Sequence, residues 1–197
     1  MICEIHITIS HSDALPRFKE WCQSRNLKPI KAVSTTGNYP IQPMTSKYVI
    51  GDVPYCIQQM HNLSQEIKAA GFTVLRDKLE VCCGTPDSLN GITSSSERVY
   101  WEAHFKIEQD KNDVLEELLK KYPCTGVSVN EWSKTSLMPL VTVRVPCDTP
   151  YEDFVGQTDI ICNQLVAAGI TLEKKRALEL AVYDSFRDMD KYWLLYT

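Results

Sequence analysis

Two short stretches of the chain carry residues that could do acid–base chemistry, and they lie 98 residues apart. The first reads Glu4-Ile5-His6-Ile7-Thr8-Ile9, and the second reads Glu102-Ala103-His104-Phe105-Lys106-Ile107. Polar and apolar residues alternate in both, which is the period of a β-strand with one buried face. Each strand therefore carries a carboxylate and an imidazole on the same face. Because histidine titrates near neutral pH, His6 and His104 are the candidate general acid and base.

The two stretches belong to a longer internal repeat. Pro54-Tyr55 recurs as Pro150-Tyr151, Ala69-Ala70-Gly71 recurs as Ala167-Ala168-Gly169, and Leu79-Glu80 recurs as Leu178-Glu179. The copies are offset by 96 to 99 residues, close to the offset of the two histidines. The sequence therefore predicts a duplicated fold.

Hydrophobic periodicity and turn residues predict the order β-α-β-β-α-β in each half. The expected strands lie near residues 2–9, 28–34, 44–50 and 72–81, and then near 99–107, 126–132, 139–145 and from 171 onward. Asp52 is the expected N-cap of the second helix, and Gly71 its expected C-terminal glycine. Thr149-Pro150-Tyr151-Glu152 is expected to form a capping box at the fourth helix.

This order predicts an α+β fold of two tandem ferredoxin-like lobes, residues 1–82 and 99–182, related by pseudo-twofold symmetry. Residues 83–98 are rich in turn formers and are expected to be the linker, and residues 183–197 form an aromatic C-terminal tail. Both helices of such a lobe cover the same face of its sheet. The two open sheet faces are therefore expected to meet at a cleft.

The polar faces of the predicted strands supply the candidate ligand-binding residues of that cleft. Besides His6 and His104, these are Glu4, Thr8, Ser46, Arg76, Lys78, Glu102, Lys106, Ser128, Asn130, Thr142 and Arg144. Buried charges are costly unless they are paired or used, so the cleft is expected to hold either a ligand or an ionic network. The basic and hydroxyl side chains favour a small anionic ligand, above all a phosphorylated one.

His6-Ile7-Thr8 on one strand and His104 on its repeat resemble the paired His-x-Thr/Ser motifs of the two-histidine (2H) phosphoesterases. This resemblance implies metal-independent phosphoester chemistry, with one histidine as base and the other as acid. Lys106 departs from the family pattern because it stands where a hydroxyl belongs. The Glu-x-His strands, Gln42-Pro43-Met44 and Tyr183-Asp184-Ser185 also resemble a group of duplicated proteins, a likeness that implies the duplication and no activity.

Two alternatives remain open. In the first, the protein is a non-catalytic binding or scaffold module, and its Glu–His pairs are structural. In the second, Glu4, His6, Glu102 and His104 form a His₂Glu₂ metal site. Nearby Arg76, Lys78, Lys106 and Arg144 disfavour a second cation, so we expect no bound metal and no cofactor. Whether the protein is an enzyme is left open at this point.

Composition excludes several classes of protein. A net charge of −4 without a basic stripe disfavours binding to duplex nucleic acid. No apolar run approaches the roughly 20 residues that a membrane span needs. The chain starts without a secretory signal, and its eight cysteines show no C-x-x-C pair. These features predict a cytoplasmic protein with reduced thiols.

Overall fold

The structure is a computed structural model of the 197-residue chain. It describes residues 1–34, 36–83, 92, 99–108, 112–133 and 138–191. Apart from Cys83 and Ile92, the expected linker therefore lies outside the described residues, as does the end of the expected tail from residue 192.

The order β-α-β-β-α-β occurs twice along the chain, as the sequence predicts. The first half consists of β1 (Ile2–Ile9), α1 (Leu15–Ser24), β2 (Lys28–Ser34), β3 (Ile41–Ile50), α2 (Val53–Ala69) and β4 (Val74–Cys82). The second half consists of β5 (Tyr100–Ile107), α3 (Asn112–Leu119), β6 (Thr125–Asn130), β7 (Leu140–Pro146), α4 (Tyr151–Ala167) and β8 (Leu172–Asp184). A short 3-10 helix, η3 (Arg187–Asp190), follows β8.

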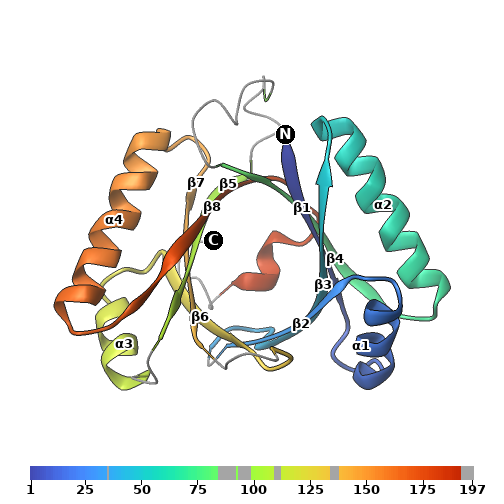
Figure 1. Ribbon diagram of the computed structural model, residues 1–197, viewed down its shortest axis with the longest axis horizontal. Coiled ribbons are helices and arrows are strands. Elements are labelled where there is room, and N and C mark those ends of the chain that lie inside the picture. The colour runs from blue at the N-terminus through green and yellow to red at the C-terminus, as the bar shows by residue number, and fades with distance from the viewer. Residues whose placement is uncertain (35, 84–91, 93–98, 109–111, 134–137, 192–197) are drawn as a thin grey trace.

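The predicted fold class is wrong, because the two halves do not form separate ferredoxin-like lobes with open sheet faces. All the described strands belong to one closed antiparallel barrel in the order β1-β3-β2-β6-β7-β5-β8-β4 (Figure 1). Two pairings join the halves: β2 pairs with β6, and β4 pairs with β8. An unpaired edge strand exposes a row of backbone donors and acceptors, and joining the edges satisfies them. What was expected to be a cleft between two sheets is the interior of this barrel.

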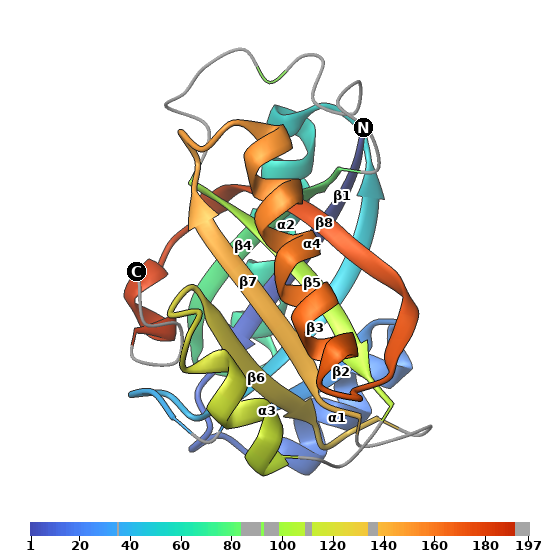
Figure 2. The same ribbon diagram turned by 90° about the vertical axis from the view of Figure 1, so that its left-hand side faces the viewer.

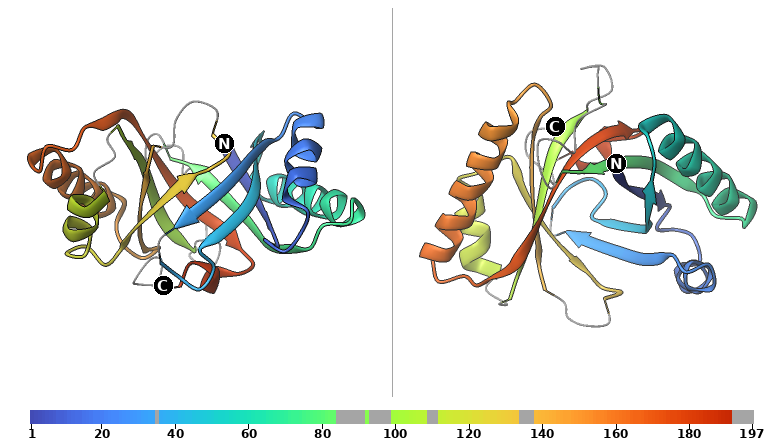
Figure 3. Two further views of the ribbon diagram at one scale, coloured as in Figure 1. Left: turned by 90° about the horizontal axis from the view of Figure 1, so that it is seen from below. Right: turned by 45° about the horizontal axis from the view of Figure 1, so that its top comes forward.

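The helices cover the outside of the barrel on two opposite sides. Those of the first half, α1 and α2, lie on one side, and α3 and α4 lie on the other (Figures 1 and 3). The hydrophobic core fills the space between helices and strands. Ile5, Ile7 and Ile9 of β1 are fully buried there, as the alternation of the strand predicts. On β5, Phe105 belongs to the same core.

Side chains alternate along each strand, so the apolar ones face the covering helices and the polar ones face the inside of the barrel. One end of the barrel is covered by η3. The view of Figure 1 looks through the ring of strands and shows η3 within it, whereas Figure 2, turned by 90°, shows η3 at one end. Asp190 of η3 is 1% exposed and accepts a hydrogen bond from Gln42 on β3. The start of the expected aromatic tail is therefore part of the barrel.

The helix-end predictions are partly confirmed. Asp52 caps α2 by accepting a hydrogen bond of 2.8 Å from the backbone N–H of Tyr55. Gly71 follows this helix with φ of 81°. The prediction of a capping box at α4 is wrong, because Pro150 is the N-cap and no side chain caps this helix.

None of the described helices is both long enough and apolar enough to span a membrane.

Two glycines give a matched test of the helix assignments. Gly71 has positive φ, so Gly71→Ala should lower the free energy of unfolding by roughly 1–2 kcal/mol. Gly156 lies inside α4, and a Cβ added there would meet no atom within 4 Å outside the helix's own nearby backbone, so Gly156→Ala should raise the free energy of unfolding by about 0.5–1 kcal/mol. Urea unfolding followed by circular dichroism measures both changes. Equal effects of the two substitutions would contradict these backbone assignments.

Candidate functional site

A cavity of about 400 Å³ lies inside the barrel. All the ligand-binding and catalytic residues proposed from the sequence line it, except Ser46. Apolar side chains complete part of the wall, among them Ile30 and Ala32 of β2, Met44 of β3 and Leu140 of β7. An eight-stranded barrel has room inside either for its own side chains or for one small ligand. This barrel retains a space of small-molecule size.

The internal duplication produces two equivalent Glu–His–Glu groups. In the first, Nε2 of His6 lies 3.7 Å from Glu4 on its own strand and 3.1 Å from Glu80 on β4. In the second, Nε2 of His104 lies 3.4 Å from Glu102 on its own strand and 3.3 Å from Glu179 on β8. Each histidine is therefore held between two carboxylates.

These carboxylates control the protonation of the imidazoles. Burial alone would lower the pKa of His104, but hydrogen bonds and charges from Glu102 and Glu179 outweigh burial and raise this pKa to about 10. Burial likewise opposes protonation of His6, and the neighbouring Glu80 and Glu4 raise its pKa. Both imidazoles are therefore biased toward the protonated, positively charged form.

Glu102 is the centre of a buried ionic network. It is 1% exposed, and its Oε1 accepts a hydrogen bond of 2.7 Å from Nε of Arg144. Its Oε2 accepts one of 2.5 Å from Nζ of Lys78, which also lies 2.8 Å from Glu80. Burial would raise the pKa of Glu102, but Arg144 and Lys78 lower it well below its usual value. The carboxylate is therefore charged across the ordinary pH range.

A second part of the network joins the barrel to η3. Arg76 donates to both carboxylate oxygens of Asp184, at 2.8 Å and 2.6 Å, and lies 2.9 Å from Asp190. Arg144 lies 2.6 Å from the same Asp190 oxygen. The Tyr100 hydroxyl donates to Asp184 at 2.6 Å. Both arginines that the sequence proposes for ligand binding therefore have carboxylate partners, as in the ionic network that the sequence left open.

The remaining residues proposed from the sequence differ in their surroundings. Thr142 Oγ1 lies 3.0 Å from Nδ1 of His104, and Ser46 donates a hydrogen bond to Glu4. Asn130 accepts hydrogen bonds from the backbone N–H groups of Lys31 and Trp132, which joins β2 to β6.

Thr8 and Ser128 are buried residues that line the cavity. Lys106 is half exposed at the rim, 3.2 Å from Glu173.

Several residues of the site were missing from the sequence-based set. Glu179 completes the second Glu–His–Glu group, and its signal was the recurrence of Leu79-Glu80 as Leu178-Glu179. Asp184 and Asp190 fall after the repeat, where no periodic pattern marked them. Tyr100 lies two residues before Glu102, on the same face of β5, and is fully buried.

Two buried donors of the cavity wall have no acceptor among the described residues. They are Nδ1 of His6 and Nη1 of Arg144. A buried donor without a partner costs about 1–3 kcal/mol, and more if it is charged. Both residues line the cavity, so a small shift of either side chain would bring its donor within reach of a ligand oxygen.

The structure also changes which residues could hold a metal ion. Within the described chain, only Glu80, His104 and Glu179 offer three ligand atoms that all lie within 4.8 Å of one another. The His₂Glu₂ set suggested by the sequence does not converge in this way. None of the eight cysteines forms a disulfide bond.

Comparison with known proteins gives little further information. No protein-family model matches the chain, and no curated protein matches it. Among solved structures, the chain is similar to the small subunit of acetolactate synthase from Thermotoga maritima, with 13% identity and a TM-score of 0.30. That match covers 92% of this chain and 96% of the other. A likeness with this TM-score indicates neither a shared fold nor a shared activity.

Proposed function

We propose that this protein binds a small molecule inside the barrel, and that the ligand carries an anionic, phosphate-like group. The observation that carries this proposal is the pair of buried donors without acceptors, His6 Nδ1 and Arg144 Nη1, on the wall of one cavity. Oxygen atoms of a phosphate are strong acceptors for imidazolium and guanidinium donors. The apolar wall at Ile30, Met44 and Leu140 would contact the rest of the ligand.

The charges around the cavity support this choice. Glu102 and Asp184 are paired with buried cations, so their negative charges are compensated inside the barrel. Burial disfavours protonation of His6 and His104, but the adjacent carboxylates outweigh it and raise their pKa, which adds positive charge at neutral pH. Lys28, which is exposed, also lines the cavity and adds a positive charge to its wall.

A thermal-shift experiment tests the proposal with adenosine, adenosine monophosphate, a cyclic nucleotide and inorganic phosphate as probes. A ligand at about 100 times its Kd stabilises the folded state by about 2.7 kcal/mol. For a chain of this size, that corresponds to a rise in Tm of roughly 5 °C or more. We expect this rise with a phosphate-bearing probe and a much smaller one with adenosine.

Two matched substitutions locate the binding. Ala32→Phe fills the cavity from β2 and should abolish the shift. Ala167→Phe adds the same ring at an exposed position of α4 and should leave the shift unchanged. Stabilisation that survives Ala32→Phe would place the ligand elsewhere, and equal shifts with adenosine and its monophosphate would refute an anionic ligand.

Phosphodiester hydrolysis is a second candidate function, favoured by the presence of both histidines and of Thr8 and Thr142 around one cavity. His6 and His104 would exchange protons with the substrate, as the resemblance to 2H phosphoesterases implies. Neighbouring carboxylates raise the pKa of both imidazoles against the effect of burial. A protonated histidine is therefore available as the general acid, whereas the histidine that acts as general base must first lose its proton. Turnover of a cyclic phosphate that rises with pH and is lost in His6→Gln would support this candidate.

A further inference from the structure

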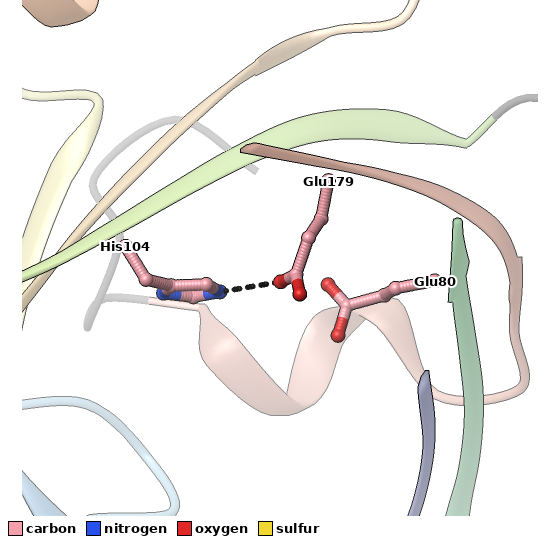
Figure 4. A group of neighbouring side chains, drawn as sticks. All are labelled: Glu80, His104 and Glu179. Carbon is pink, nitrogen blue, oxygen red and sulfur yellow. Dashed lines mark ion pairs between the residues drawn. The ribbon is translucent and has the colours of Figure 1, made fainter. Parts of the chain in front are cut away.

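Three side chains from three neighbouring strands converge within the cavity. Glu80 comes from β4, Glu179 from β8 and His104 from β5, and β8 lies between the other two strands. Figure 4 shows the carboxylates of Glu80 and Glu179 facing each other beside the imidazole of His104. Their ligand atoms all lie within 4.8 Å of one another. Two carboxylates at this separation repel each other unless a cation lies between or beside them.

The state of Glu80 is an independent observation. This residue is 1% exposed, and neither of its carboxylate oxygens accepts a hydrogen bond from the described part of the chain. Its charge is compensated only through ion pairs, with Lys78 at 2.8 Å and His6 at 3.1 Å. A buried carboxylate usually accepts several hydrogen bonds or coordinates a metal ion. A metal ion at Glu80 would therefore compete with Lys78 and His6 for these two oxygens.

The imidazole of His104 is oriented as in a typical metal ligand. Its Nδ1 lies 3.0 Å from the Thr142 hydroxyl, and its Nε2 is directed toward Glu179. Histidines that bind metals usually place the other ring nitrogen against a hydrogen-bonding partner, which fixes the ring and its tautomer. The neighbouring carboxylates favour a proton on Nε2, and a bound cation would replace that proton. With Nδ1–H donating to Thr142, the lone pair of Nε2 would then face the cation.

We propose that Glu80, His104 and Glu179 bind a divalent cation of the first transition series. Two carboxylates and one imidazole are ligands that Mn²⁺, Fe²⁺ and Zn²⁺ accept. The sequence argued against a metal because of nearby cations. However, Arg76 and Arg144 are neutralised by Asp184, Asp190 and Glu102. The cations that would compete with a metal ion at Glu80 are Lys78 and His6. The ligand set also differs from the His₂Glu₂ set expected from the sequence.

The test measures binding of Mn²⁺ alone, by titration calorimetry and by loss of the free-ion EPR signal. Mn²⁺ is preferred to Zn²⁺ as the probe because cysteine thiols outside the site would compete for Zn²⁺. We expect one ion per chain in the wild type. Glu179→Gln should weaken binding by more than about 100-fold, since changes outside the ligand set alone cost about 10- to 100-fold. Glu173→Gln, a half-exposed glutamate of the same strand, should bind as the wild type does.

Thr142→Val gives a second measurement that leaves all three ligands in place. It removes the partner of His104 Nδ1 and should weaken Mn²⁺ binding by about 10-fold, with little change in the circular dichroism spectrum. Absence of Mn²⁺ binding in the wild type would overturn the proposal, as would equal binding by wild type and Glu179→Gln. The experiment contains no organic ligand, so its failure leaves the anionic-ligand proposal standing.

Discussion

Glu102→Gln should destabilise the protein by about 3 kcal/mol or more, which is among the largest effects expected for a single substitution. Removing one member of a buried charge network leaves its partners uncompensated, at a typical cost of 3–5 kcal/mol. Here the amide would face Arg144 and Lys78, whose hydrogen bonds to Glu102 are 2.7 Å and 2.5 Å long. Asp190 and Glu80 remain as their second partners, which limits the loss.

Urea unfolding at pH 7 measures this loss against a matched control. Glu173→Gln removes the same charge from an exposed pair with Lys106, so its cost should stay below about 1 kcal/mol. Total stabilities of domains are about 5–15 kcal/mol, so the difference should be visible as a clear drop in the urea midpoint. A loss below 1 kcal/mol in Glu102→Gln would mean that the interior network contributes no more than surface pairs do.

The second large effect concerns pH. Although burial opposes it, Glu102 and Glu179 raise the pKa of His104 from 6.5 to about 10, so the folded state retains a proton that the unfolded state releases. The resulting stabilisation is fully present below pH 6.5 and is lost as the pH rises toward 10. One retained proton changes the free energy of unfolding by about 1.4 kcal/mol per pH unit. Between pH 7 and pH 9, the wild type should therefore lose on the order of 2–3 kcal/mol through this histidine.

The quantity to compare between variants is the slope of the free energy of unfolding against pH, because substitutions can also change stability in a way that does not depend on pH. His104→Gln should flatten the decline between pH 7 and pH 9, whereas His61→Gln, on the exposed face of α2, should leave it unchanged. Part of the slope should persist in His104→Gln, because Glu80 and Glu4 raise the pKa of His6 against the effect of burial. Burial also raises the pKa of buried thiols such as Cys22, to about 11, so measurements above pH 9 report other groups. Parallel curves for wild type and His104→Gln would refute the assignment.

The sequence determined the local elements and the faces of the strands. Strict alternation in residues 4–9 and 102–107 placed Ile5, Ile7 and Phe105 in the outer core and the histidines on the opposite face. This works because a strand reverses side-chain direction at every residue, whatever its partners are. The internal repeat likewise identified two equivalent Glu-x-His strands before any contact between them was known.

Only the tertiary structure decided how the halves join and which charges meet. The pairings of β2 with β6 and of β4 with β8 are contacts between segments far apart in the chain, and no local pattern encodes them. Closing the barrel turned an expected cleft into the interior of the barrel and placed Glu80 beside Glu179. The pairing of Arg76 and Arg144 with Asp190 depends on where η3 lies, beyond the repeat. Side-chain type fixes what a residue can do, whereas its partners, and hence its charge, follow from contacts that only the closed barrel creates.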